Sequence, residues 1–401
     1  MSLFLLIYFA AYGGMNAYCC WKVLQAFPMA RWQGLLVAGF FLLMVLAPLA
    51  IQLLDRGGQL RLARALSWLG HNWMAVAVWA FLLLATADIW NVLLRLVALA
   101  APAVRRAALP HPATVLAVAG IVVVLAAIAI TQANSVSLRE IVLRSPRLPR
   151  SARPIRIAQV SDVHLGITTG PSRFSRTIEL LRQAQPDVIV ATGDIFDSSS
   201  DTDEMADHAR ELAALQPPLG KFTVLGNHEF YVGLGRSLEF YKTAGFRVLR
   251  GESARVGEHL MICGVDDPTG ERLGMKTFTQ ELAALPSPQD RPAVVVLLKH
   301  QPRVLPTSPG QFDVQLSGHT HGGQFFPFSL LVCGIYPYCH GLYPLEVGAP
   351  AGAAAERGTV NDGAKSCPLP ALYVSRGVGT WGPKMRLLSP PEVAIIRVEP
   401  E

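Results

Sequence analysis

Seven side chains that can ligate a metal ion follow short apolar segments in the second part of this 401-residue chain. They are Asp162, His164, Asp194, Asn227, His300, His319 and His321. A mixture of carboxylate, imidazole and amide ligands suits manganese, iron or zinc ions better than a thiolate site would. The residue types therefore predict a metal centre, provided that the fold brings these distant positions together.

The spacing of these residues supports the same chemistry. Asp162 and His164 are separated by one residue, and so are His319 and His321. In extended backbone, side chains two residues apart point to the same side, so each pair can hold one ion or span two. Glycine precedes Asp194 and also His319, and glycine allows a sharp turn and a close backbone approach.

The apolar segments that precede these residues alternate with amphipathic ones. We expect strands at 155–160, 188–191, 222–225, 260–263, 293–298, 313–316, 372–374 and 393–398. We expect helices at 172–184, 205–215 and 236–244. This alternation predicts a layered α/β domain, partly parallel at first and more mixed toward its end. In open α/β sheets, sites form beyond the carboxyl ends of the strands, where residues distant in sequence can converge.

Five short motifs, in this order, resemble those of the calcineurin-like metallophosphoesterases. The motifs are Asp162-Val163-His164, Gly193-Asp194-Ile195-Phe196-Asp197, Gly226-Asn227-His228-Glu229, Lys299-His300 and Gly318-His319-Thr320-His321. Each motif alone is a weak signal, but five in register are a strong one. The resemblance covers about residues 155–398, and the whole chain is similar to the transmembrane proteins with a metallophosphoesterase domain.

The resemblance implies a fold and a set of metal ligands. The fold would be a four-layer α/β/β/α sandwich that holds two divalent metal ions, with manganese, zinc and iron as the candidates. The first metal would be ligated by Asp162, His164, Asp194 and His321. The second would be ligated by Asp194, Asn227, His300 and His319. Asp194 would bridge the two ions.

The resemblance also implies a reaction. A hydroxide bridging the two metals would attack phosphorus, so that no protein nucleophile is needed. His228 would protonate the leaving oxygen or stabilise its charge. Asp197 would orient that histidine, and a solvated loop acid is the alternative interpretation of this residue. Glu229 is expected to support the ligands rather than to act in catalysis.

One departure from the family pattern narrows the substrate. Ser198 stands where protein Ser/Thr phosphatases usually have an arginine that binds the substrate phosphate, so that subclass is disfavoured. A phosphate monoester, a phosphodiester and a pyrophosphate all remain open as substrates, and a membrane enzyme has access to lipid-linked ones. The alternatives are a UDP-diacylglucosamine-type pyrophosphatase of lipid biosynthesis and a non-enzymatic metal-binding membrane module.

The first part of the chain has the composition of a membrane region. The whole chain is 51% hydrophobic and only 16% charged, against roughly a quarter charged in soluble proteins. We expect transmembrane helices at about 2–21, 32–54, 66–90 and 112–133, each close to the roughly 20 residues that a span requires. A cleaved signal peptide is the alternative for the first, which lacks a basic start. These helices form a region 1–138, followed by a linker 139–154 and a phosphoesterase domain 155–401.

Charge and cysteine content bear on partners and location. Residues 151–401 hold 23 basic and 26 acidic residues, so no nucleic-acid partner is predicted; the expected partners are the substrate and membrane lipid. Seven basic residues would flank the inner side of the spans and four the outer side, which favours a cytoplasmic domain with reduced cysteines. A disulfide among Cys333, Cys339 and Cys367 would instead indicate an oxidising compartment. Residues 347–364 are expected to be a surface insertion, and His208 is expected on the surface or in a loop.

Overall fold

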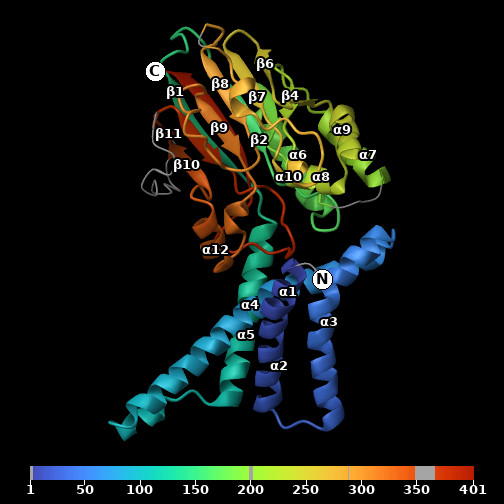
Figure 1. Cartoon of the computed structure of the whole chain (residues 1–401), viewed down its shortest axis with the longest axis vertical. Coiled ribbons are helices and arrows are strands. Elements are labelled where there is room, and N and C mark those ends of the chain that lie inside the picture. The colour runs from blue at the N-terminus through green and yellow to red at the C-terminus, as the bar shows by residue number, and fades with distance from the viewer. Residues whose placement is uncertain (1–2, 198–201, 288, 348–365) are drawn as a thin grey trace. The chain divides into compact units, whose positions relative to one another are not determined.

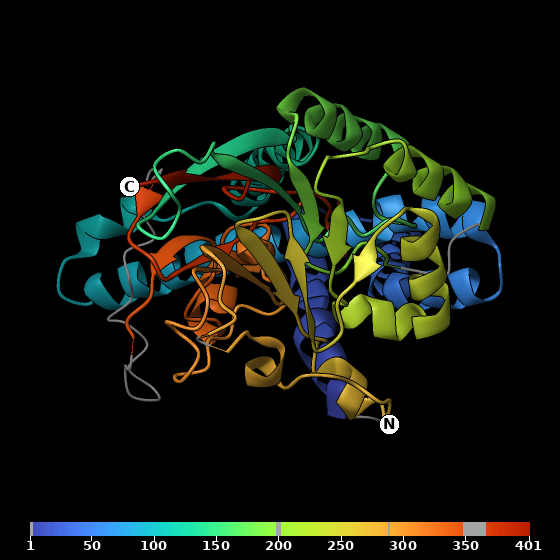
Figure 2. The same ribbon diagram turned by 90° about the horizontal axis from the view of Figure 1, so that it is seen from above.

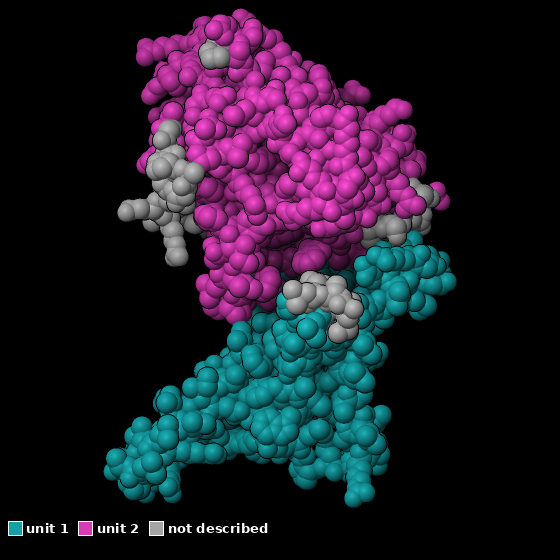
Figure 3. Space-filling view, in the orientation of Figure 1, with its two compact units in different colours: residues 1–131, 382–385 teal, residues 132–381, 386–401 magenta. Residues whose placement is uncertain are grey.

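The computed structural model describes residues 3–197, 202–287, 289–347 and 366–401. The chain divides into two compact units, which Figure 3 distinguishes by colour. Unit 1 comprises residues 1–131 and 382–385, and unit 2 comprises residues 132–381 and 386–401.

Unit 1 is helical (Figure 1). Its elements are α1 (Leu3–Tyr8), a π-helical turn (Phe9–Gly13), α2 (Gly14–Ala26), α3 (Arg31–Arg56), α4 (Leu60–Val97), a 3₁₀ turn (Pro102–Ala107) and α5 (His111–Ala133). Of these, α3, α4 and α5 are long and apolar enough to cross a membrane. They contain the three later predicted spans. The first predicted span is helical but is divided by the π turn, and its crossing of the membrane stays a prediction.

Polar side chains within unit 1 have partners. Lys22 is buried, and its Nζ lies 2.7 Å from Asp88 Oδ1. The Tyr18 hydroxyl donates to the other oxygen of Asp88 at 2.7 Å. Helix α2 contacts both α3 and α4, and Tyr12 just before it is buried. Residues of the first predicted span are thus packed as part of unit 1.

Unit 2 contains two β-sheets, which Figure 2 shows as two layers. The first has the order β11-β1-β13-β2-β3-β4-β5, and the second β10-β12-β9-β8-β7-β6. The strands of the first are β1 (Ser137–Ser145), β2 (Ile155–Val160), β3 (Val188–Ala191), β4 (Lys221–Thr223), β5 (Arg247–Val248), β11 (Ser366–Cys367) and β13 (Glu392–Pro400). Those of the second are β6 (Glu252–Val256), β7 (Leu260–Gly264), β8 (Val294–Leu298), β9 (Val314–Ser317), β10 (Gly341–Pro344) and β12 (Ala371–Val374).

Unit 2 has seven α-helices in the part of the chain that the structure describes, and some of them cover the outer faces of the sheets. The seven are α6 (Pro171–Ala184), α7 (Thr202–Ala213), α8 (Asn227–Val232), α9 (Leu234–Thr243), α10 (Thr269–Arg272), α11 (Glu281–Ala284) and α12 (Phe328–Ile335). The first sheet shares a core with α6, α7 and α9, which includes Phe174, Leu212 and Phe240. On the second sheet the outer layer is thinner, with α11 against β6 and β7. The predicted four-layer α/β/β/α arrangement is confirmed.

A second core lies between the two sheets. Ile157 and Val190 of the first sheet pack in one buried cluster with Val296 and Leu316 of the second. Neighbouring residues along β2 serve different cores, since Ala158 belongs to the cluster under the helices. Strands that are buried on both faces consist of almost continuous apolar residues, which is why the sequence pattern located most of them.

The predicted linker 139–154 is wrong over its first half. Residues Ser137–Ser145 form β1, which pairs in parallel with β13 along its whole length. Ile141 and Leu143 of this strand are buried in the core between the sheets. Unit 2 therefore begins well before residue 155. The predicted insertion 347–364 lies outside the described residues from 348 onward.

Candidate metal centre

The seven candidate ligands lie in loops that follow the carboxyl ends of strands in both sheets. Strands β2, β3 and β4 are parallel neighbours, and so are β7, β8 and β9. Asp162 follows β2, Asp194 follows β3 and Asn227 follows β4, while His300 follows β8 and His319 follows β9. Parallel pairing brings the loops of each sheet to one edge, and His300 Nε2 after β8 lies 3.2 Å from Asp194 Oδ2 after β3, so the loops of the two sheets also meet.

The first group of ligands consists of Asp162, His164 and His321, all buried. The Nε2 atoms of His164 and His321 lie 3.0 Å apart. His321 Nε2 lies 3.6 Å from Asp162 Oδ1. Asp162 also supports the segment that contains His319 and His321. Both Asp162 oxygens accept from the backbone N–H of His319, at 3.0 and 3.1 Å.

The second group is centred on His300. Its Nε2 lies 3.2 Å from Asp194 Oδ2, 3.0 Å from Asn227 Oδ1 and 3.1 Å from His319 Nδ1. The same oxygen of Asp194 lies 4.0 Å from His164 Nε2 in the first group. Asp194 therefore lies between the two groups, as a bridging ligand must.

The backbone at these positions is strained. Five candidate ligands have positive φ values: Asp162 (51°), His164 (51°), Asp194 (54°), His319 (74°) and His321 (52°). Non-glycine residues rarely adopt this conformation, which costs energy and is found mainly at functional sites. Two glycines in this region have no room for a side chain. A Cβ on Gly318 would collide with Asp162, and one on Gly226 with Asp194.

The two buried carboxyl groups of the cluster need neighbouring positive charge in order to be ionised. Burial raises the pKa of Asp162. Burial acts in the same direction on Asp194, but the neighbouring His300 and His228 outweigh it and hold the pKa of Asp194 well below its usual range. Two carboxylates, four imidazoles and one amide oxygen, with their ligand atoms in contact, form a donor set that fits two divalent cations.

His228 and Asp197 form a pair beside this cluster. Asp197 Oδ1 lies 3.0 Å from His228 Nδ1 and 3.6 Å from His164 Nδ1. Thr168 Oγ1 donates to the other Asp197 oxygen at 3.0 Å. The Asp197 side chain is only 12% exposed, which does not fit a solvated loop acid. Burial opposes the charge on His228, but Asp194 and Asp197 outweigh it and raise the pKa of His228 to about 9.

Glu229 supports the ligand loops, as expected from its place in the motif. Its carboxylate accepts from the backbone N–H groups of Asp194, Ile195 and Gly226 at 2.8 to 2.9 Å. It also accepts from the Tyr241 hydroxyl at 2.9 Å. One buried side chain thus fixes both Asp194 and the loop that carries Asn227.

Two further residues reach the histidine ligands without having been predicted. Arg386 is fully buried, its Nη2 lies 3.2 Å from His321 Nδ1, and its Nε donates to the Gly379 carbonyl at 3.0 Å. The Tyr336 hydroxyl lies 2.8 Å from His319 Nε2. Neither residue belongs to a motif, and no local pattern in the sequence marks either one.

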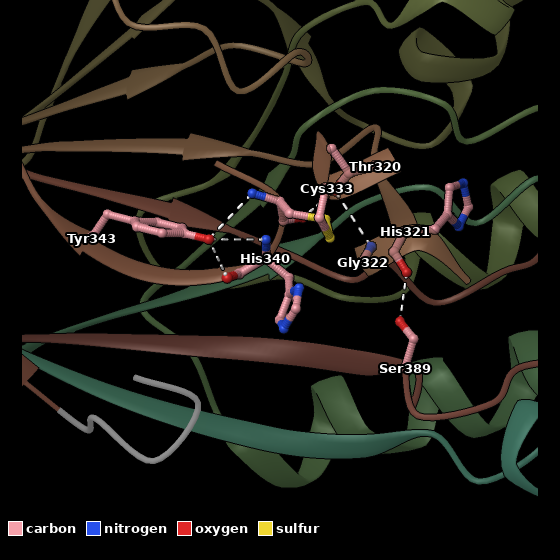
Figure 4. The surroundings of a disulfide bond; sticks show 8 residues. Thr320, His321, Gly322, Cys333, His340, Tyr343 and Ser389 are labelled. Carbon is pink, nitrogen blue, oxygen red and sulfur yellow. Dashed lines mark hydrogen bonds between the residues drawn. A yellow bond between two sulfur atoms is a disulfide. The ribbon is translucent and has the colours of Figure 1, made fainter. Parts of the chain in front are cut away.

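One expectation about the cysteines needs correction. Cys333 and Cys339 form a disulfide, shown in Figure 4, so the expectation of reduced thiols is wrong for this pair. Cys263 and Cys367 are free.

The prediction for His208 is also wrong, because this residue is not on the surface. It is buried on α7, where its ring packs 4.4 Å from the ring of Phe174, because that face of the helix covers the first sheet.

The family follows from comparison with known proteins. A sequence model of the calcineurin-like phosphoesterases matches residues 155–323. An uncharacterized metallophosphoesterase of Aquifex aeolicus is 41% identical over 258 residues, which are 64% of this chain and 89% of that protein. The chain belongs to the calcineurin-like metallophosphoesterases. Unit 2 is thus the domain of a metal-dependent phosphoric ester hydrolase.

Other relatives are matched over a smaller share of their length. An uncharacterized metallophosphoesterase of Campylobacter jejuni is 29% identical over 66% of this chain and 65% of that protein. A transmembrane protein with metallophosphoesterase domain from Danio rerio is 27% identical over 62% of this chain and 54% of its own length. Among solved structures, a 5'-nucleotidase precursor from Thermus thermophilus is similar over 62% of this chain and 54% of its own, at 15% identity and a TM-score of 0.30.

Proposed function

We propose that this chain is a membrane-anchored phosphoesterase that hydrolyses a phosphate ester or pyrophosphate bond at a two-metal site. The convergence of seven predicted ligands on two groups that share Asp194 is the observation that carries the proposal. One ion would be held by Asp162, His164, Asp194 and His321. The other would be held by Asp194, Asn227, His300 and His319.

The chain's own residues have separate tasks in this proposal. When bound, the two divalent ions would supply an activated water and positive charge for the phosphoryl oxygens. His228 holds the proton for the leaving oxygen. Its Nδ1 faces Asp197, so the proton to be transferred is carried on Nε2. Asp197 keeps the imidazole protonated and oriented, and no protein nucleophile is required.

An amphiphilic substrate is the class that the surface beside the site favours. Helix α12 leaves Leu330, Leu331 and Ile335 more than half exposed. Tyr336 follows directly and contacts the ligand His319. Contiguous exposed apolar side chains of this kind mark contacts with lipids or apolar ligands. The acyl or prenyl part of a lipid-linked phosphate would lie against them while its phosphate reaches the metals. A UDP-diacylglucosamine-type pyrophosphatase is one enzyme of this class.

For the side of the membrane, we propose the oxidising one. Four of the seven basic residues that favoured the cytoplasm lie in β1 and the turns after it: Arg139, Arg144, Arg147 and Arg150. They belong to a folded domain, and long domains translocate largely regardless of charge. Without these four, three basic residues flank the inner side of the predicted spans and four flank the outer side. The Cys333–Cys339 disulfide supports the oxidising side, since disulfides are rare in reducing compartments.

The experiment that tests the function is a turnover screen of the full chain in detergent or nanodiscs. Manganese, zinc, iron or nickel is supplied in turn with an aryl phosphomonoester, an aryl phosphodiester, lipid-linked phosphates and a lipid-linked pyrophosphate. We expect chelator-sensitive hydrolysis that is highest for a lipid-linked compound and mostly lost in Asp194→Asn. Bound metal without turnover of any substrate would favour the non-enzymatic module. Faster turnover of the soluble esters would overturn the amphiphilic substrate class.

A further inference from the structure

The two nitrogens of the His319 ring have different partners. Nδ1 faces the second ligand group, 3.1 Å from His300 Nε2. Nε2 faces the Tyr336 hydroxyl at 2.8 Å. An imidazole that ligates a metal through Nδ1 must carry its proton on Nε2. The Nε2–H group of His319 would then donate a hydrogen bond to the Tyr336 hydroxyl. Partners of this kind fix the tautomer and the orientation of a ligating histidine.

Tyr336 lies within a small loop that the disulfide closes. Helix α12 carries Cys333 and ends at Ile335, and the loop returns to Cys339. The loop is anchored at its far end, since the Tyr343 hydroxyl of β10 accepts from the backbone N–H groups of Cys339 and His340, as Figure 4 shows. The disulfide therefore limits how far Tyr336 can move from the histidine.

The same loop touches the histidine motif at a second point. Thr320 stands between His319 and His321, and its hydroxyl donates to the Cys339 carbonyl at 2.5 Å. Helix α12 also packs against the turn His321–Gly323. Helix α12, which carries Cys333, and Cys339 itself thus both contact the segment that contains His319 and His321.

From these contacts we propose that Tyr336 is a positioning residue for His319, and that the Cys333–Cys339 disulfide holds it in place. Retention of the second metal would then depend on the disulfide. This inference rests on the two-metal site proposed above. Opening the disulfide with a phosphine breaks the S–S bond and forms two thiols. The phosphine becomes its oxide with an oxygen atom from water, whose two protons end on the thiols.

The test compares two tyrosines of the same loop by metal content. Tyr336→Phe removes only the hydroxyl that contacts His319. Tyr338→Phe is the control, because Tyr338 packs on the Tyr343 ring at 5.1 Å and its hydroxyl has no described contact with a ligand. Metal per chain is measured on the full-length protein after dialysis against graded chelator. We expect affinity for one of the two ions to fall about 10- to 100-fold in Tyr336→Phe and to stay unchanged in Tyr338→Phe.

Two further measurements separate positioning from folding. The visible absorption of the cobalt-loaded protein reports ligand geometry, and we expect it to change in Tyr336→Phe but not in Tyr338→Phe. The double variant Cys333→Ser, Cys339→Ser, or wild type treated with a phosphine, should lose the same ion. A Tyr336→Phe variant with wild-type affinity and spectrum overturns the role of Tyr336. Two free thiols in the native protein overturn the role of the disulfide. Absence of metal from the wild type would instead refute the proposed function.

Discussion

Asp197 Oδ1 lies 3.0 Å from His228 Nδ1, although the two residues belong to different motifs. The contact exists because β3 and β4 are parallel neighbours, so the loops that follow them leave the same edge of the sheet. His228 is adjacent in sequence to the ligand Asn227 but presents a nitrogen to Asp197. In the proposed function, this geometry separates the residues that would hold metal from a pair that would transfer a proton.

The first prediction separates these two tasks. Asp194→Asn should remove most activity and weaken retention of both metals, because the bridging carboxylate supplies charge to two cations. His228→Ala should lower turnover by roughly 10²- to 10⁴-fold, as for loss of a general acid, with metal content near wild type. Turnover and metal per chain are measured on the same preparations. Loss of metal from His228→Ala as severe as that from Asp194→Asn would refute the role of His228.

The second prediction concerns pH. A general acid must be protonated, so activity should be present below the pKa of His228 and lost as pH rises through it. The neighbouring carboxylates raise that pKa to about 9, and bound cations would pull it down. Asp197→Asn removes one negative charge and lowers the pKa of His228, so the alkaline limb of the kcat profile should move to lower pH. His228→Ala should lack this limb. An alkaline limb at the same pH in Asp197→Asn would contradict the pairing.

The third prediction concerns Glu229. In Glu229→Gln the amide nitrogen replaces an oxygen that accepts from backbone N–H groups, so two donors face each other in a buried site. An unsatisfied buried group costs about 1 to 3 kcal/mol, so the melting temperature and metal retention should both fall. Glu239→Gln on the exposed side of α9 is the matched control, because that side chain is 71% exposed. Equal melting temperatures for the two variants would show that Glu229 has no such role.

The ligand positions were predictable because they belong to short motifs beside strands with strong apolar signals. Strands β3 and β8 are fully buried on both faces and are continuous runs of apolar residues. Parallel neighbours within one sheet place the residues that follow them at one edge, but β3 and β8 belong to different sheets. The grouping of His300 with Asp162 and Asp194 across the two sheets was implied by the resemblance to the calcineurin-like metallophosphoesterases and not by the strand pattern.

Other features depend on contacts that leave no local pattern. Strand β1 carries charged residues at exposed or partly exposed positions, and it pairs with β13, which lies at the far end of the sequence. Strand formation of this kind is decided by the neighbouring strand more than by intrinsic propensity. The same holds for Tyr336 and Arg386, which meet the ligand histidines only through the tertiary fold. The disulfide was left open, because the distance between two cysteines is not given by their spacing.

The last prediction decides which side of the membrane unit 2 faces. Glu258 lies in the turn between β6 and β7 with its side chain 87% exposed, so Glu258→Cys places a reactive thiol on the surface of unit 2. A membrane-impermeant maleimide applied to intact cells should label this variant if the domain lies on the oxidising side. The wild-type chain, whose free cysteines are buried or half-buried, gives the background. Labelling only after the membrane is opened, with Cys333 and Cys339 found as thiols, would instead place the domain in the cytoplasm, as the count of basic flanking residues predicted.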